Sequence, residues 1–566
     1  MDKWESKRNL MKSIFYAAAF LLLLSGAVDA REAQGNSQSG TVPSADLVIP
    51  LQPGEKVWSG VIKHGENMPY AAGGGFDFYA NNRENQIQPL LLGSRGLWVW
   101  SEEPYAFEVA ADKIVITKAR GEVKHGRAGS TLAEARKYAS DKFFPPSGRM
   151  PDELLFAQPQ YNTWIELTYN QNQEDVLKYA RAILSNGFPP GVLMIDDTWQ
   201  ENYGVWNFHP GRFPNPKQMM DELHRMGFKV MVWMCPFVSA DQARLVRQLL
   251  KDKCFLMQKA AAQTTWETAT DPAIIKWWNG YSALLDFSNP AAVRWYNEQM
   301  DRLVKDYGVD GFKLDAGDMP FYATDALSMR PVSPNRQCEL HAQFGLRFPL
   351  NEYRACWKMA GQPLGQRLHD KYHIWDDVQR LIPQMLTEGL VGYTFSCPDL
   401  IGGGDYVSFL NLKTVDQDLI VRAAQVHALM PMMQFSLAPW RVLDAEHLAA
   451  VKQAVKIRAE FAPVILQLAR QSARTGDPII SSLEYAFPHQ GFELIKDEFM
   501  LGDSLLVAPL DKKGTSRQLV LPKGTWIGDD GKTLKGGATY TLDVPLDRIP
   551  RFRLLPPEQG TEKQTK

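Results

Sequence analysis

From about residue 159 onward, short apolar runs typical of buried strands alternate with stretches of helical periodicity. The run at 191–195 leads into two aspartates, and the run at 228–234 leads into Cys-Pro. The candidate strand ends fall near Leu167, Asp197, Pro236, Asp315, Met359, Asp370, Asp399 and Phe435. Several of the steps between them are close to the roughly 30 residues of one strand plus one helix. The alternation predicts a central (β/α)8 barrel, a TIM barrel, over residues 151–441.

Two steps in this series do not fit one strand plus one helix. The step from Pro236 to Asp315 is long and requires an insertion, which we expect at residues 254–289. The step from Met359 to Asp370 is too short for a helical crossover between parallel strands. One of these two strand ends must therefore be irregular.

The hydrophobic pattern on either side of the predicted barrel is different. Residues 45–150 contain short alternating runs such as Leu97–Trp100 and Lys113–Ile116, broken by Gly and Asn, which is typical of a β-sandwich. Residues 442–555 begin with helical patterns and continue as strands with Gly-rich turns, which predicts a second β-sandwich. The predicted fold is therefore a central barrel flanked by N-terminal and C-terminal β-sandwich domains, with a polar tail at 556–566.

The N-terminus has the pattern of a secretory signal peptide at residues 1–30. Basic residues precede a short apolar run, and small residues follow it. Residues 31–44 are small and polar, typical of a flexible mature N-terminus. We expect an exported protein, most simply periplasmic, with no stable membrane span after cleavage. An extracellular protein and an uncleaved signal anchor are the alternatives. The five widely spaced Cys suggest neither a disulfide framework nor a zinc site.

Composition narrows the class of partner. The net charge is −2 with 22% charged residues. The chain therefore has no excess of basic residues that would suggest a nucleic-acid partner. Aromatic residues make up 11%, and aromatic rings serve both cores and sugar sites. Trp199, Trp233, Trp375 and Trp440 lie near strand ends; each alone is more typical of a core, and we expect one or two to face a sugar. The expected partner is an oligosaccharide or glycoside.

Two aspartates stand where barrel strands end. Asp315 closes the apolar segment 309–315 and is followed at once by small residues; Asp370 lies 55 positions further on. The carboxyl ends of barrel strands share one rim, and two acids there can form the pair that cleaves a glycosidic bond. A lone aspartate at a strand end is otherwise a common helix cap.

Several motifs, in order, are similar to those of glycoside hydrolase family 31. The C-terminal hallmark is matched by residues 502–509, followed by Leu521–Trp526. A barrel block resembles residues 213–229, and a late block resembles residues 392–403. The resemblance covers roughly residues 48–555. It implies a barrel glycosidase that needs no metal and no cofactor.

The resemblance also implies roles for individual residues. Asp315 would be the nucleophile and Asp370 the general acid/base, with Asp315 ionised and the pKa of Asp370 raised by burial or by a neighbouring carboxylate. The family's substrate-binding aspartate would be Asp197 or its neighbour Asp196. An arginine that often stands sixteen residues before the acid/base is matched by Arg354.

Three positions depart from the α-glucosidases of the family. Lys313 stands where a Trp is usual, and Arg367-Leu368-His369-Asp370 stands where Trp-x-Gly-Asp is usual. Ser436 occupies the place of a sugar-contacting His. The changes resemble the branch of myogenesis-regulating glycosidase, associated with α-galactosides, and we expect the three positions to line one pocket.

These departures leave several functions open. Lys313 and Arg367 could recognise hydroxyls, pair with Asp318 or Asp399, or bind a charged sugar. The favoured interpretation is a retaining α-galactosidase, with an α-glucosidase, α-xylosidase or anionic-sugar glycosidase as alternatives on the same scaffold. A catalytically silent carbohydrate-binding protein is the alternative of a different class. The residues expected at the site are Asp315 and Asp370 for catalysis and Asp197, Asp196, Trp199, Trp233, Lys313, Arg354, Arg367, Asp399 and Trp440 for substrate.

Overall fold

The computed structural model describes residues 46–82, 85–410 and 412–556. The predicted signal peptide, the segment 31–44 and almost all of the predicted tail lie outside the described residues. Within the described part, none of the helices combines the length and the apolar character that crossing a membrane requires. The domain boundaries expected from the sequence stay predictions.

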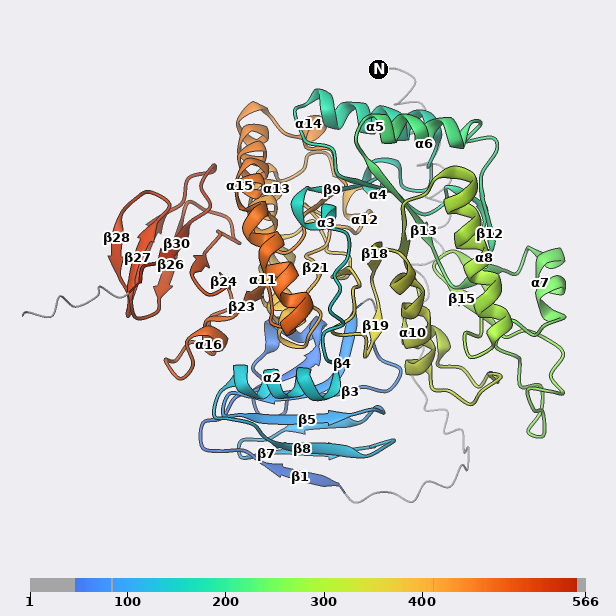
Figure 1. Ribbon diagram of the computed structural model, residues 1–566, viewed down its shortest axis with the longest axis horizontal. Coiled ribbons are helices and arrows are strands. Elements are labelled where there is room, and N and C mark those ends of the chain that lie inside the picture. The colour runs from blue at the N-terminus through green and yellow to red at the C-terminus, as the bar shows by residue number, and fades with distance from the viewer. Residues whose placement is uncertain (1–45, 83–84, 411, 557–566) are drawn as a thin grey trace, which may run out of the picture. The chain divides into compact units, whose positions relative to one another are not determined.

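Eight parallel strands form the central barrel that the alternating pattern predicts. Their order is β21-β20-β18-β17-β13-β10-β9-β22. Figure 1 labels β9, β13, β18 and β21 near the centre of the molecule. The bounds are β9 Gln160–Asn162, β10 Val192–Ile195, β13 Lys229–Met234, β17 Gly311–Leu314, β18 Leu350–Tyr353, β20 Gln366–Arg367, β21 Ser396–Cys397 and β22 Gln434–Phe435. The two end strands meet where the backbone N–H of Ile401, just after β21, donates to the Gln434 carbonyl at 2.9 Å. The sheet is therefore a nearly closed barrel.

Helices follow most of the barrel strands and pack on their outer face. They are α5 Gln173–Ser185, α6 Pro216–Arg225, α8 Pro290–Tyr307, α10 Pro334–Ala342, α11 Trp375–Leu390, α13 Gln417–Ala428 and α15 Ala445–Thr475, with the short α9 Met319–Tyr322, α12 Val407–Leu410 and α14 Pro439–Val442 at the ends of loops. Helix α8 illustrates how local sequence sets its bounds. The Asn289 side chain caps its start, Pro290 is its first residue, and Gly308 ends it with φ of 81°.

Two of the strand ends predicted from the sequence are wrong. The run ending at Leu167 is the short helix α4, Trp164–Leu167, because the Asn162 side chain accepts the Trp164 N–H and turns the chain after β9. The segment 355–360 is not a barrel strand either: Cys356–Trp357 forms β19, which pairs with β4 of an N-terminal sheet. The chain thus passes from β18 to β20 without a helix, which accounts for the short step.

The long step before Asp315 holds an insertion, as predicted, although it begins earlier than residue 254. Strands β14 Phe237–Ser239, β15 Ile274–Trp277 and β16 Gly280–Leu284 form a small antiparallel sheet in the order β14-β16-β15, with α7 Ala243–Leu250 beside it. Residues 278 and 279 form the tip of the β15–β16 hairpin.

The N-terminal residues form two sheets, drawn in blue at the bottom of Figure 1. One has the order β1-β7-β6-β3; the other has the order β19-β4-β5-β8, with β2 also paired to β4. The bounds are β1 Leu47–Pro50, β2 Val57–Val61, β3 Gly75–Asp77, β4 Gln86–Gly93, β5 Leu97–Ser101, β6 Ala106–Val109, β7 Lys113–Thr117 and β8 Val123–Arg127, with η1 Ile62–Asn67, α2 Leu132–Phe143 and α3 Leu154–Ala157. Because a barrel-loop strand, β19, is part of the second sheet, this region is joined to the barrel by backbone pairing.

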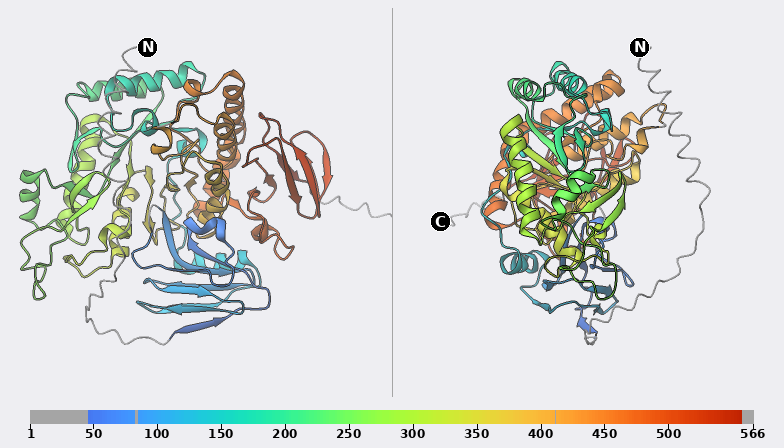
Figure 2. Two further views of the ribbon diagram at one scale, coloured as in Figure 1. Left: turned by 180° about the vertical axis from the view of Figure 1, so that it is seen from behind. Right: turned by 90° about the vertical axis from the view of Figure 1, so that its right-hand side faces the viewer.

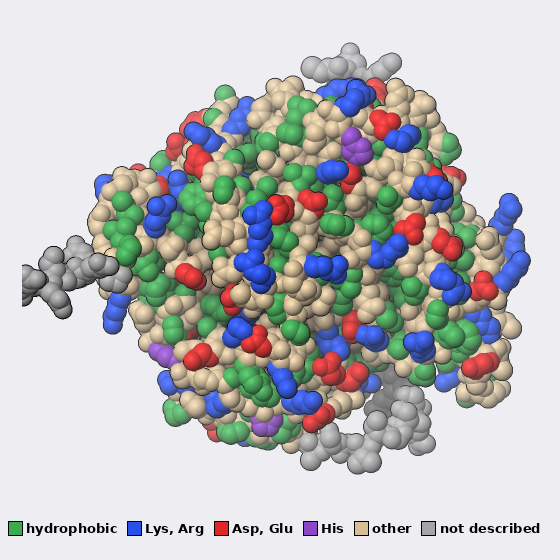
Figure 3. Space-filling view, in the orientation of Figure 1, with side chains coloured by type: hydrophobic (Ala, Val, Ile, Leu, Met, Phe, Trp, Pro, Cys, Tyr) green, Lys and Arg blue, Asp and Glu red, His purple; other side chains and the backbone are tan. Residues whose placement is uncertain are grey.

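The C-terminal strands, in red in Figure 2, follow the long helix α15. They build their own small core around Trp526 and Phe552. A six-stranded sheet has the order β23-β24-β25-β30-β27-β28, and β26 pairs with β29. The bounds are β23 Ile480–Ser481, β24 Phe499–Leu501, β25 Leu505–Val507, β26 Ser516–Leu521, β27 Thr525–Gly528, β28 Thr533–Lys535, β29 Ala538–Asp543 and β30 Arg551–Leu554. On the face drawn in Figure 3, acidic and basic side chains are interspersed, in keeping with the small net charge.

Candidate active site

Asp315 lies at the carboxyl end of β17 and is held from several directions. Its Oδ2 accepts the Trp233 indole N–H at 2.7 Å, and its Oδ1 accepts the Ala316 backbone N–H at 2.8 Å. The Arg354 Nε lies 3.3 Å from Oδ1. The chain then turns sharply at Gly317, where φ is 97° and a Cβ would meet the His341 ring at 2.3 Å. Trp233 and Arg354, both expected at the site, therefore orient this carboxylate.

The surroundings of Asp315 favour its ionised form. Burial raises the pKa of this carboxyl, but Arg354 and Lys313 outweigh burial and hold the pKa below its ordinary value. An ionised carboxylate with a fixed orientation is the state that a nucleophile requires.

Asp370 is three residues beyond β20 and is more open, with 36% of its side chain exposed. The Arg367 Nη1 donates to its Oδ1 at 2.7 Å. Burial raises the pKa of Asp370, but Arg367 and Arg354 outweigh it and bring the pKa to about 2. The sequence-based expectation of a raised pKa at Asp370 is therefore wrong, because Arg367 stabilises the carboxylate.

A second buried carboxyl, that of Asp399, shares the Arg367 guanidinium with Asp370. The same Arg367 Nη1 lies 2.5 Å from Asp399 Oδ1, and Asp399 is fully buried. Burial raises the pKa of Asp399 to about 7; Arg367 opposes the rise, and repulsion from Asp370 adds to it. The two carboxyls share one guanidinium, so their titrations belong to the pair. The directions of the two shifts favour a proton of this pair on the buried Asp399 over the more open Asp370.

A buried layer of charge lies beneath the two carboxyls. The Lys313 Nζ is 2.6 Å from Asp196 Oδ2, with Lys313 and Asp196 side chains 7% and 3% exposed. On the neighbouring strands, Arg367 Nε lies 3.3 Å from Glu352 Oε1, and Gln434 of β22 donates to Glu352 at 2.6 Å. Both departures Lys313 and Arg367 thus have carboxylate partners inside the protein, which stabilise charges that burial would otherwise penalise.

The expectation that Lys313, Arg367 and Ser436 line one pocket does not hold in this form. The Lys313 and Arg367 side chains lie in the charged layer under the carboxyls, 7% and 2% exposed. Ser436 is fully buried, and its Oγ accepts the Ile165 backbone N–H at 2.7 Å. All three side chains are therefore buried beneath or behind the rim.

Asp197 lies at the end of β10 beside the insertion hairpin. Its Oδ2 accepts the Asn279 side-chain N–H at 2.7 Å and the Tyr203 hydroxyl at 3.1 Å. Burial raises the pKa of Asp197 to about 7, partly opposed by the Gln200 hydrogen bond. Next to Asn279, the ring of Trp278 is 44% exposed and lies under the Arg354 guanidinium at 4.9 Å. The hairpin tip thus joins Asp197 to the surroundings of Asp315.

The other tryptophans expected at the site lie elsewhere. Trp199 is fully buried and donates its indole N–H to the Trp233 carbonyl. Trp440 packs on Tyr179 and Phe188 beside helix α5, outside the strand ends. Both are core or outer-layer residues, because an apolar ring near a strand end can pack under the rim as readily as over it. Trp375 donates its indole N–H to the Asp416 carboxylate, which caps the start of α13.

Sequence reasoning missed several residues that the fold brings to this rim. Trp278 and Asn279 come from the insertion, where the Asn-Gly pair between two strand-like runs was a hairpin signal. Trp164, Tyr169 and Tyr406 form an aromatic cluster from the loops after β9 and β21, with ring centroids 5.3–5.8 Å apart. No sequence pattern joins these loops, which meet only through barrel closure.

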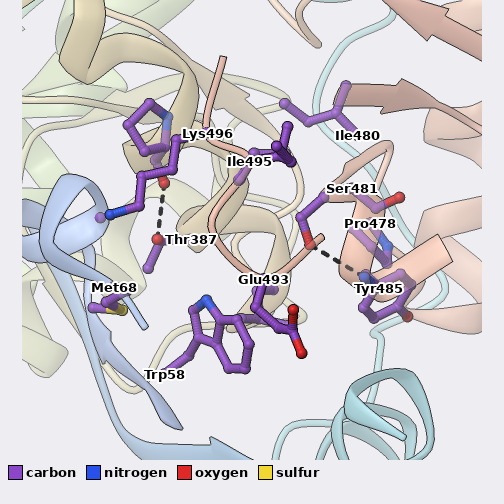
Figure 4. A pocket seen from close by; sticks show the side chains of 15 residues that line it. Trp58, Met68, Thr387, Pro478, Ile480, Ser481, Tyr485, Glu493, Ile495 and Lys496 are labelled. Atoms are coloured by element: carbon purple, nitrogen blue, oxygen red, sulfur yellow. Dashed lines mark hydrogen bonds between the residues drawn. The ribbon is translucent and has the colours of Figure 1, made fainter. Parts of the chain in front are cut away.

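Two cavities with defined walls lie away from this rim. The one in Figure 4 is bounded by Trp58, Met68, Thr387 and Tyr485, between the N-terminal sheets, α11 and the C-terminal region, and has a volume of about 30 Å³. That is room for a water or two and not for a sugar. A second, of about 330 Å³, is lined by charged residues including Glu66, Arg380 and Asp511. In the described residues, no group of three or more His, Cys, Asp or Glu side chains is arranged to hold a metal ion.

Comparison with known proteins agrees with this architecture. Residues 155–468 match the glycosyl hydrolases family 31 TIM-barrel domain, and residues 476–553 match the family's C-terminal domain. The chain is 32% identical over 434 residues to the myogenesis-regulating glycosidase of Mus musculus, covering 74% of this chain and 59% of that protein. It is 24% identical over 481 residues to alpha-glucosidase 2 of Bacillus thermoamyloliquefaciens, covering 79% of this chain and 58% of that protein.

The fold is shared with solved structures at lower identity. The Flavobacterium johnsoniae GH31 dextranase complexed with glucose superposes with a TM-score of 0.78 at 18% identity, covering 92% of this chain and 68% of that chain. The chain spans slightly less than 60% of the two curated relatives named above. Because the barrel-domain match takes in more than half of its residues, the chain belongs to glycosyl hydrolase family 31.

Proposed function

We propose that this protein is a retaining α-glycosidase that hydrolyses terminal α-linked sugars, with α-galactosides as its preferred substrates. In the first step the Asp315 carboxylate attacks the anomeric carbon, and the proton of the Asp370–Asp399 pair passes through Asp370 to the departing glycosidic oxygen. In the second step Asp370 takes a proton from water as the oxygen of that water displaces Asp315 from the same carbon. The sugar leaves with its α configuration.

The observation that carries the proposal is the pairing of two aspartates at one barrel rim with opposite surroundings. Asp315 is oriented by an indole N–H and lies beside Arg354, which suits a nucleophile. Asp370 is open on one side and is next to a carboxyl whose pKa is about 7, which suits a residue that must both give and take a proton. The shared family supports the same assignment.

The pairing of the buried cations bears on the sugar. Lys313 contacts Asp196, and Arg367 contacts Glu352, Asp370 and Asp399. Binding a sugar carboxylate or sulfonate through these groups would require breaking buried ion pairs, at a cost of several kcal/mol. A neutral sugar is therefore favoured over an anionic one. The preference for galactose rests on the departures at Lys313, Arg367 and Ser436 and on the similarity to myogenesis-regulating glycosidase.

A panel of p-nitrophenyl α-glycosides tests the proposal. We expect kcat/KM for the α-galactoside to exceed that for the α-glucoside by at least about a hundredfold, because a site built around one hydroxyl leaves buried polar groups unpaired with its epimer. Proton NMR of the first product should show the α anomer. Equal rates would leave a glycosidase without galactose preference, a faster α-xyloside or α-glucoside would reassign the sugar, and a β anomer would mean inversion.

A catalytically silent carbohydrate-binding protein is the alternative of a different class. It predicts saturable binding of sugars with no product from any member of the panel, and with Asp315→Asn behaving like the wild type. The presence of both carboxyls with their surrounding cations favours the enzyme.

We further propose that the protein is exported to the periplasm by its N-terminal segment, on the strength of the signal-peptide pattern in residues 1–30. Cell fractionation and N-terminal sequencing of the purified protein test this. A protein that keeps Met1 and stays with the cytoplasmic fraction would contradict it.

A further inference from the structure

Three amide side chains of the N-terminal region contact the segments that carry the two catalytic carboxyls. We propose that Asn82, Asn85 and Gln86, called here the amide clamp, are positioning residues for catalysis: Asn85 and Gln86 for the acid/base Asp370, and Asn82 for the segment after the nucleophile Asp315. The inference rests on the proposed glycosidase function and assigns part of the catalytic geometry to a region outside the barrel.

The acid/base side of the clamp binds the backbone on both sides of Leu368. The Gln86 Nε2 donates to the Arg367 carbonyl at 3.0 Å, and the Asn85 Oδ1 accepts the His369 backbone N–H at 3.2 Å. The same Gln86 Nε2 also lies 3.3 Å from the Tyr353 carbonyl at the end of β18. Two neighbouring residues thus fix the peptide groups that immediately precede Asp370.

Asn85 also contacts the His369 ring. Its Nδ2 lies 3.2 Å from His369 Nδ1, and the Lys371 Nζ lies 3.0 Å from the same nitrogen. Both neighbours are donors, and the Lys371 Nζ also lies 3.4 Å from Nε2, so the ring is surrounded by donors. Burial, with Lys371 adding to it, lowers the pKa of His369 well below its ordinary value. The acid/base is therefore preceded by a neutral, oriented side chain.

The nucleophile side of the clamp is the bond from Met319 to Asn82. The Met319 backbone N–H, four residues beyond Asp315, donates to Asn82 Oδ1 at 2.7 Å. The Asn82 Nδ2 lies 3.5 Å from Cys338 Sγ on helix α10. This contact holds the loop that returns from Asp315 to the helix layer, after the sharp turn at Gly317.

All three amides are buried, with exposures of 2% for Asn82, 1% for Asn85 and 0% for Gln86. A buried polar side chain is stable there only because it is hydrogen-bonded, so each bond is geometrically demanding. Replacing Asn85 by Ala would leave the His369 N–H without its acceptor, and the peptide before Asp370 could relax. Misplacing a catalytic group by about 1 Å can cost about a hundredfold in rate.

A positioning role for Asn85 predicts that the loss in rate depends on the leaving group of the substrate. A simple loss of stability predicts the same loss for every substrate. Protonation by Asp370 matters for a poor leaving group such as methoxide and is dispensable for an acidic one such as 2,4-dinitrophenolate. The nucleophile is needed for both. Misplacing Asp370 should therefore slow only the poor substrate, whereas misplacing Asp315 should slow both alike.

The test compares kcat/KM on methyl and 2,4-dinitrophenyl α-galactoside for Asn85→Ala, Asn82→Ala and Asn81→Ala. Asn81→Ala is the matched control, because its side chain is exposed and, among the described residues, donates to the Asp77 carbonyl of its own loop. We expect Asn85→Ala to lose at least about thirtyfold on the methyl glycoside and less than about threefold on the activated one, within the range of general acid catalysis. Asn82→Ala should lose similar factors on both, and Asn81→Ala should match the wild type.

Gln86→Ala removes the donor to the Arg367 carbonyl on the same side of the clamp and serves if Asn85→Ala does not fold; it should slow the methyl glycoside more than the activated one. Equal losses on both substrates in a folded Asn85→Ala or Gln86→Ala would overturn the positioning role while leaving the glycosidase intact. A wild type without activity on any α-glycoside would overturn the proposed function and this inference together.

Discussion

Asp315 and Asp370 both lie at the same rim of the barrel. The side chain of Asp315 is held in one orientation, whereas that of Asp370 is partly exposed to solvent. Asp315 accepts an indole N–H and a backbone N–H and has a side chain 12% exposed. Asp370 is held by Arg367 and has a side chain 36% exposed. The difference suits their two proposed roles, because a nucleophile must stay ionised and aimed, whereas an acid/base must exchange a proton with the leaving group and later with water.

Asp315→Asn tests the fixed side of this comparison and should have the largest effect. The amide cannot form the glycosyl bond, so kcat/KM should fall at least about ten-thousandfold on every substrate, the scale seen when a catalytic nucleophile is removed. The variant should still unfold cooperatively, because the amide keeps the size of the side chain, although at a lower temperature, because Arg354 and Lys313 lose a buried counter-charge. Substantial remaining turnover, with a mechanism-based fluorosugar attached to another residue, would move the nucleophile elsewhere.

Asp370→Asn tests the open side and should discriminate between substrates. We expect a loss of about a hundredfold to ten-thousandfold on alkyl glycosides and a much smaller loss on 2,4-dinitrophenyl glycosides, which need no proton. Azide should restore the rate on the activated substrate, since it needs no general base in the second step. If both classes of substrate slowed equally, Asp370 would not be the acid/base, and the comparison with Asp315 would fail.

Asp399→Asn tests whether Asp399 holds the proton that Asp370 delivers to the leaving group. Of the three variants it should have the smallest effect on the rate. The pair of Asp370 and Asp399 holds a proton below about pH 7 because burial raises the pKa of Asp399. An acid must be protonated, so kcat/KM of the wild type should fall as the pH rises through about 7. Without the Asp399 carboxyl, Arg367 still favours the ionised form of Asp370, so this alkaline limb should move to lower pH.

The measurement is a pH profile of kcat/KM on an alkyl glycoside, with Asp405→Asn as a control. Asp405 is near Asp370, but it does not contact Arg367 in the hydrogen bonds of the described residues, and burial raises its pKa as well. An unchanged alkaline limb in Asp399→Asn would show that the proton is kept on another group.

The barrel and its insertion could be predicted because their signals are local. A buried strand of a parallel sheet is apolar throughout, and the helices between strands have their own periodicity, so both are legible in short windows. The failures at Leu167 and Met359 have a common cause. A short apolar run is compatible with a strand, a helix or an edge of another sheet, and only tertiary pairing places β19 beside β4 of the N-terminal region.

The sequence by itself determined the family, the two carboxyls and the cations beside them, because motif order and residue type survive without coordinates. Only the tertiary structure decided how these groups interact. Arg367 lowers the pKa of Asp370 where burial alone would raise it, and Lys313 contacts Asp196, which is 117 residues away. The hairpin tip at Asn279 and the amide clamp likewise reach the rim from distant segments. Electrostatic and hydrogen-bond energies depend on distance and burial, and those are set by the fold.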